Sequence, residues 1–161
     1  MKLSGPKSLV LNDTKPGDLV VTQHGTDTIK GIVLYKNVEK IHVLKLASGH
    51  PENLSIVPLL DGTRCLSFGS NWRLNVDYND ETSFSFDDDK VAGRIVFAEE
   101  GPHLTVIEVG TYNQTFPSLS VTDWTLKPIS MFNTTSASHW SIFLLGDDGE
   151  ALSEAPFFTH R

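Results

Sequence analysis

The densest group of residues that could bind a metal ion is an acidic run between residues 77 and 89. The run contains six carboxylates and no base. Ca²⁺ takes about six to eight oxygen ligands, and carboxylates in loops supply several of them. A hairpin over 72–86 would place the two ends of the run far apart, so only Asp87, Asp88 and Asp89 form a compact metal candidate. The competing interpretation, which we favour, is a solvated acidic edge that discourages strand-to-strand aggregation, and no cofactor is predicted.

Two tryptophans are the candidate ligand-binding residues. Trp124 follows a break in the alternation of apolar and polar residues, and Trp140 follows a stretch rich in Ser and Thr. A half-exposed ring at such a position can stack on a sugar face or contact a protein partner. Trp72, in contrast, starts an alternating segment and is predicted to anchor the core. Burial remains the competing interpretation for Trp124 and Trp140, because large aromatic side chains dominate core energetics.

Residue types that often catalyse reactions are present, but they form no catalytic pattern. The six histidines lack metal-ligand spacing, and the one cysteine, Cys65, is predicted to be a small buried hydrophobe in a strand. The sequence contains no glycine-rich phosphate loop, no Cys-x-x-Cys pair and no His-Glu-x-x-His motif. Whether the protein is an enzyme is left open, with a non-catalytic role preferred.

Composition and charge exclude several classes of partner. The chain has 161 residues, 39% of them hydrophobic, with a formal net charge of −7 and an isoelectric point near 5.2. No cluster of Lys and Arg offers the basic footprint that nucleic acid or an anionic membrane surface requires. The N-terminus has no apolar signal segment, and the longest uncharged run is too polar to cross a bilayer. We therefore expect a soluble, cytoplasmic protein that binds neither nucleic acid nor membrane.

The elements that position these residues are predicted to be strands. Apolar and polar residues alternate over 72–78 and again over 83–86, and the turn-forming pair Asn79-Asp80 lies between them, which predicts a hairpin over 72–86. Turn signals recur at short spacing along the chain, and no segment keeps a sustained helical period. The predicted fold class is all-β with little helix, either two tandem small barrels or one continuous β-sandwich or barrel.

Residues 27–46 and 89–109 read alike and indicate a possible internal repeat. Asp-Thr-Ile-Lys-Gly-Ile-Val-Leu-Tyr in the first matches Asp-Lys-Val-Ala-Gly-Arg-Ile-Val-Phe in the second, and each is followed by a polar turn and an apolar segment. The second segment has one inserted residue, Arg94, after which Ile32 matches Ile95 and Ile41 matches Leu104. The alternative is that hydrophobic hairpins resemble one another by composition. The pattern suggests a barrel-like unit over 10–66, a second β unit over 67–145 and a C-terminal tail over 146–161.

The start of the chain also resembles a known type of fold. Lys15-Pro16-Gly17-Asp18-Leu19-Val20-Val21, followed by Lys30-Gly31-Ile32-Val33, resembles the opening of SH3-like small barrels. In such barrels a Pro-Gly turn leads into the first strand and a Gly precedes the next. The resemblance implies an SH3-like fold for this part of the chain and implies no function.

The sequence thus predicts a non-catalytic β-domain that acts as a protein-interaction or structural module. Its partner would be another protein, or further copies of the chain in a homo-oligomer. One alternative is a carbohydrate-binding β-sandwich that uses Trp124 or Trp140 together with the acidic loop, and another is a hydrolase with dispersed active-site residues. A pocket with convergent polar groups would favour the enzyme, and a flat apolar patch would favour the module.

Overall fold

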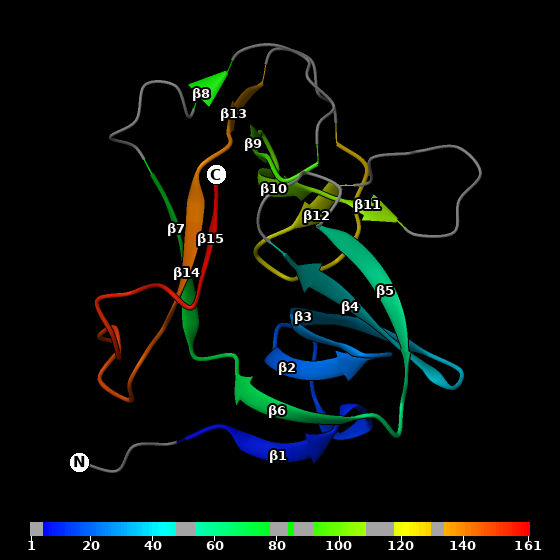
Figure 1. Ribbon diagram of the computed structural model, residues 1–161. Coiled ribbons are helices and arrows are strands. Elements are labelled where there is room, and N and C mark those ends of the chain that lie inside the picture. The colour runs from blue at the N-terminus through cyan, green and yellow to red at the C-terminus, as the bar shows by residue number, and fades with distance from the viewer. Residues whose placement is uncertain (1–4, 48–53, 78–83, 86–91, 109–117, 130–133) are drawn as a thin grey trace.

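The computed structural model describes residues 5–47, 54–77, 84–85, 92–108, 118–129 and 134–161 (Figure 1). Within these ranges the regular structure is β, apart from the short 3-10 turn η1 (Leu11–Asp13). The prediction of an all-β fold with little helix is therefore confirmed. No helix in the described part of the chain is long and apolar enough to cross a membrane.

The largest sheet comes mainly from the first half of the chain and has seven strands, which are β1 (Lys7–Val10), β2 (Leu19–His24), β3 (Asp27–Asn37), β4 (Lys40–Leu46), β5 (Ser55–Leu60), β6 (Arg64–Gly69) and β11 (Ile107–Glu108). Their order is β1-β6-β2-β3-β4-β5-β11. Neighbours pair antiparallel, except that β11 joins β5 in parallel. The long β3–β4 hairpin follows from the run of β-branched and apolar residues in both strands.

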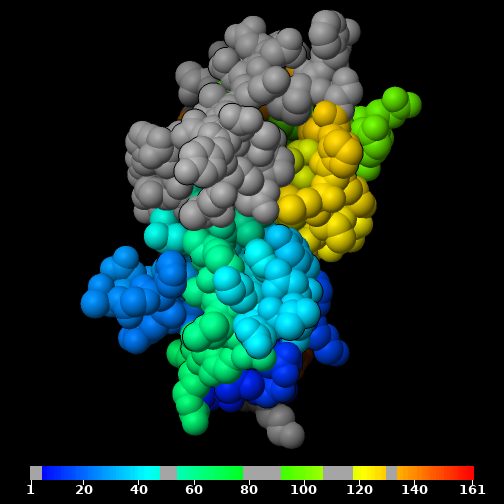
Figure 2. Space-filling model, turned by 90° about the vertical axis from the view of Figure 1, so that its right-hand side faces the viewer, coloured from blue at the N-terminus to red at the C-terminus, as the bar shows by residue number. Residues whose placement is uncertain are grey.

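Two smaller sheets come from residues 72–160. The five-stranded sheet has the order β12-β10-β9-β13-β8, and the three-stranded sheet has the order β15-β14-β7. The strands of the five-stranded sheet are β8 (Phe84–Ser85), β9 (Ile95–Ala98), β10 (Gly101–Thr105), β12 (Ser118–Ser120) and β13 (Thr135–Ala137), and those of the three-stranded sheet are β7 (Trp72–Val76), β14 (Trp140–Leu144) and β15 (Phe158–His160). The stretch 146–161, expected as a tail, thus ends in a paired strand. In the side view, residues 118–129 (yellow) lie above the strands of the first half of the chain (Figure 2).

One hydrophobic core connects all three sheets. In β4, the neighbours Val43 and Leu44 are both fully buried but belong to different clusters, because successive strand residues point to opposite faces. Leu44 belongs to the larger cluster, which also holds Ile95 from the five-stranded sheet and Trp140 from the three-stranded sheet. The smaller cluster, with Val43, draws only on the first half of the chain. The seven-stranded sheet is therefore buried on both faces.

None of the three sheets closes into a barrel. The SH3-like barrels implied by the resemblance are therefore not confirmed. The shared core gives the physical reason, because each open sheet covers its apolar face with the other two sheets instead of curling around a core of its own. The boundary between units 10–66 and 67–145 stays a prediction, and the larger cluster crosses it.

The predicted hairpin over 72–86 is wrong. Strand β7 pairs with β14, with Trp72 opposite Leu144 and Val76 opposite Trp140. Strand β8 lies in a different sheet and pairs with β13. The alternation identified the strands correctly, but local turn residues do not decide pairing when a distant strand buries the apolar face.

The internal repeat is not confirmed either. Both segments form antiparallel hairpins, β3–β4 and β9–β10. Their registers differ, since Ile32 lies opposite Leu44 whereas Ile95, its counterpart in the repeat, lies opposite Leu104. Leu104 corresponds to Ile41 in the sequence match, and Ile41 lies opposite Lys36.

Candidate functional site

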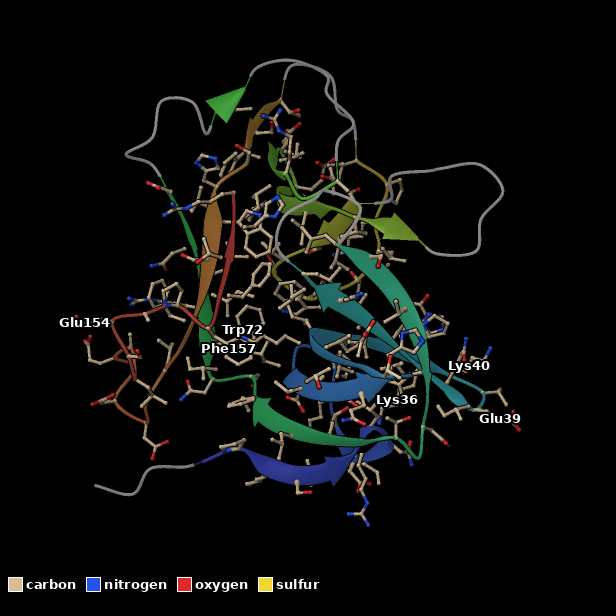
Figure 3. All side chains as sticks on the ribbon, viewed as in Figure 1. Lys36, Glu39, Lys40, Trp72, Glu154 and Phe157 are labelled. Atoms are coloured by element: carbon tan, nitrogen blue, oxygen red, sulfur yellow. The ribbon has the colours of Figure 1, made fainter. Side chains whose placement is uncertain are left out.

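A cleft of about 610 Å³ opens where the three sheets diverge. This volume lies in the usual range for small-molecule and peptide-side-chain sites, roughly 300–1,000 Å³. Figure 3 shows Trp72 extending from β7 toward this central region. The walls are the turn before β2, strand β7, the β9–β10 hairpin and the turn after β12, and the lining residues are Pro16, Gly17, Ser70, Trp72, Leu74, Val76, Ile95, Phe97, Pro102, Val121, Thr122, Asp123 and Trp124.

The Pro16–Gly17 turn fixes the Trp72 side of the cleft. Gly17 has φ +87°, a left-handed conformation that glycine adopts without strain. Its N–H donates to the Val33 carbonyl at 2.8 Å, which ties the turn to β3. Its carbonyl accepts a 2.9 Å hydrogen bond from the indole Nε1 of Trp72. The indole is therefore held at both its polar atom and its apolar face, which packs on the larger cluster.

A tight turn presents Trp124 on the opposite side. The Trp124 N–H donates to the Ser120 carbonyl at 2.9 Å, and the Ser120 N–H donates to the Thr125 carbonyl at 2.9 Å. Trp124 has φ +57°, which is uncommon for a residue other than glycine. Such a conformation costs of order 1–3 kcal/mol and persists only where its surroundings hold it. The turn therefore holds the ring in one place at a cost in backbone strain.

The two indoles meet over Gly17. Their ring centroids lie 5.1 Å apart and their planes are tilted by 47°, so the rings form a wedge. A Cβ atom on Gly17 would lie only 3.1 Å from Cδ1 of Trp124. A side chain at residue 17 would thus require Trp124 to shift by a few tenths of an ångström and would strain the left-handed backbone of the turn. Among the described residues, none accepts a hydrogen bond from the indole N–H of Trp124.

Asp123 is the only charged side chain among the described residues that line the cleft. Its carboxylate accepts a hydrogen bond from the Lys127 ammonium, and its Oδ1 accepts hydrogen bonds from the hydroxyl and the backbone N–H of Thr125. The Lys127 ammonium, followed by the Thr125 hydroxyl, holds the pKa of Asp123 well below its usual range. The side chains of Asp123 and Lys127 are 45% and 48% exposed, so the carboxylate is ionised and open to solvent at neutral pH.

The structure divides the three tryptophans differently from the sequence prediction. Trp124 does line a cleft, but Trp140, expected to be half exposed, is only 2% exposed. Trp140 lies in the central strand of the three-stranded sheet, and its Nε1 donates to the Gly93 carbonyl at 2.9 Å. Its covered ring cannot stack on a ligand. Trp72 packs on the core as predicted, but it also lines the cleft.

The metal candidates Asp87, Asp88 and Asp89 lie outside the described residues. Within the described ranges, no group of three or more His, Cys, Asp or Glu side chains is placed to hold a metal ion. Cys65 is buried, as predicted, and this burial raises the pKa of its thiol, with smaller contributions from Asp18 and Asp13.

Several cleft residues were not among the sequence candidates, notably Pro16, Gly17, Phe97 and Asp123. The Pro-Gly pair is visible in the sequence as a turn, but nothing local shows that its carbonyl meets an indole from β7. Phe97 comes from a third sheet, so only the tertiary arrangement brings it to the tryptophans. No protein-family model, no curated protein and no solved structure gives a significant match to this chain.

Proposed function

We propose that this protein is a non-catalytic binding module that holds a segment of a partner protein in the cleft of Trp72 and Trp124. The observation that supports the proposal is the cleft itself, with two indoles held by specific contacts at the junction of three sheets. Tryptophans are over-represented among the residues that dominate binding energy at protein interfaces. Strain at Trp124 is also typical of a functional position.

The chemistry of the cleft supports binding over catalysis. General acid–base catalysis needs a group whose pKa lies near the working pH. Among the described lining residues Asp123 is the one titratable group, and its pKa is lowered, so it holds no proton to transfer near neutral pH. The remaining side chains of this described lining are apolar, apart from the hydroxyls of Ser70 and Thr122.

The test is a selection of short random peptides on phage against immobilised protein. We expect the wild-type protein to enrich a related set of sequences, and Trp124→Ala to lose their binding because half of the wedge is removed. Val38→Ala is the matched control, since Val38 is 89% exposed at the tip of the β3–β4 hairpin and does not line the cleft. Circular dichroism and urea unfolding establish that both variants fold.

Binding that survives in Trp124→Ala and Trp72→Phe alike would contradict the proposal, as would a failure to enrich any sequence family. If the partner is a second copy of this chain, sedimentation equilibrium will show association that Trp124→Ala weakens and Val38→Ala does not.

Carbohydrate binding is the second candidate function. The indole N–H of Trp124 without a described acceptor and the hydroxyls of Ser70 and Thr122 favour it, because sugars need both a ring to stack on and polar partners. An array of immobilised glycans, probed with the same variants, tests this candidate. Glycan binding that requires Trp124 would favour it over a protein partner.

A further inference from the structure

Three aromatic rings line the cleft from three different segments. Trp72 comes from β7, Phe97 from β9 and Trp124 from the turn after β12. The face of an aromatic ring carries partial negative charge, and indole attracts a cation most strongly. The chain already uses this contact elsewhere, because the ammonium of Lys30 stands 4.4 Å from the ring centroid of Phe157.

The charge of the cleft points to the same class of ligand. None of the described residues that line it is a Lys, Arg or His, and the one charged group among them is the carboxylate of Asp123. The whole chain carries a net charge of −7, which repels anions and attracts cations over a longer range. The ion pair of Asp123 with Lys127 is solvent-exposed, and exposed pairs of this kind contribute little. An incoming cation can therefore share the carboxylate without breaking a strong contact.

From these observations we infer that the cleft takes the alkylammonium end of a lysine side chain of the partner, either unmodified or N-methylated. The inference rests on the proposed binding function and adds the chemistry of the bound group. The aliphatic stem of lysine packs along the apolar wall of Leu74 and Val76, while its charged end meets Asp123 and the parts of the two indoles that line the cleft. A neutral side chain of similar length keeps only the apolar contact.

The test compares end-blocked tripeptides that differ only in the central side chain. Gly-Lys-Gly, its Nε-trimethyl form, its Nε-acetyl form and the norleucine analogue are titrated against the protein, and indole fluorescence reports binding. We expect both charged peptides to bind at least about tenfold more tightly than the norleucine and acetyl-lysine peptides. Methylation keeps the charge, whereas acetylation removes it.

Two matched variants locate the effect. Asp123→Asn removes the negative charge while keeping an oxygen that can accept the hydrogen bonds of Thr125, and we expect it to weaken binding of the charged peptides alone. Asp147→Asn makes the same change at an exposed residue that does not line the cleft, and we expect no effect. Higher salt should reduce the difference between the wild-type protein and Asp123→Asn.

Equal binding of the lysine and norleucine peptides would overturn the inference and leave the proposed binding function intact. Selected phage peptides that bind through Trp124 but lack any basic residue would overturn it in the same way. If neither the selected peptides nor the tripeptides bind the wild-type protein in a way that depends on Trp124, the proposed function itself fails.

Discussion

Burial and hydrogen bonding give the three tryptophans distinct roles. Trp140 is enclosed in the central strand of the three-stranded sheet and bonded to the Gly93 carbonyl. Trp72 and Trp124 are only partly buried and line the cleft. All three residues interrupt or begin alternating segments in the sequence, so local pattern does not separate them. The distinction depends on which distant strand or turn covers each ring.

This distinction predicts different costs for removing each ring. Trp140→Ala should lower the free energy of unfolding by about 3–5 kcal/mol, as large-to-small core substitutions do. Trp140→Phe should cost about 1–3 kcal/mol, because it leaves the buried Gly93 carbonyl without its donor. Trp124→Ala should cost less than Trp140→Ala, since the ring of Trp124 is only partly buried. Urea unfolding measures all three, and an equal cost for Trp124→Ala and Trp140→Ala would contradict the assignment.

The buried imidazole of His160 predicts a dependence of stability on pH. Burial, and to a smaller extent His139, lowers the pKa of His160 below its ordinary value of about 6.5. As the pH falls below 6.5, the unfolded chain binds a proton that the folded chain resists, so stability is lost until the pH passes the folded pKa. We expect the free energy of unfolding to be lower at pH 5.5 than at pH 7.5. The drop should shrink in His160→Gln but persist in His24→Gln, since His24 is exposed. An unchanged drop in His160→Gln would argue against this cause.

The sequence identifies the strands well, but it does not identify which strands pair with one another. Alternation over Trp72–Val76 identifies both β7 and the face that it turns to the core. Its partner, β14, follows it by more than sixty residues, and no local signal links the two. The adjacent apolar residues Val43 and Leu44 are both buried, on opposite faces of β4. The cleft could not be predicted, because it arises where strands and turns from all three sheets fail to close on one another.

Alanine substitutions at two glycines, one in β3 and one in an open turn, test the close contact of β3 with β4. A Cβ at Gly31 would lie 2.4 Å from Cγ1 of Val43 and 2.8 Å from the backbone oxygen of Leu44, so one strand must shift. We expect Gly31→Ala to lower the free energy of unfolding by about 1–3 kcal/mol, as overpacking does. Gly62→Ala is the control, because no atom lies within 4 Å of a Cβ there, and it should stay within about 0.5 kcal/mol of wild type. Thermal or urea unfolding gives both values, and equal effects would show that the strands do not pack this closely.

Across the molecule, three open sheets share one core and leave a cleft at their junction. A closed barrel would bury the inner faces of its strands completely. Here, in contrast, the residues of β7 that face the core stay partly exposed along the cleft wall. The fold itself thus creates the cleft that we propose as the binding surface, with Trp72 and Trp124 in its lining.

The most direct test of the binding cleft uses the three indole N–H signals in a ¹H–¹⁵N correlation spectrum. Trp→Phe variants assign the signals, and a peptide from the phage selection is then added stepwise. We expect the signals of Trp72 and Trp124 to shift together with one dissociation constant, while the signal of Trp140, enclosed in the core, stays in place as an internal control. Binding that moves only the Trp140 signal, or none of the three, would contradict the assignment of this cleft as the binding site.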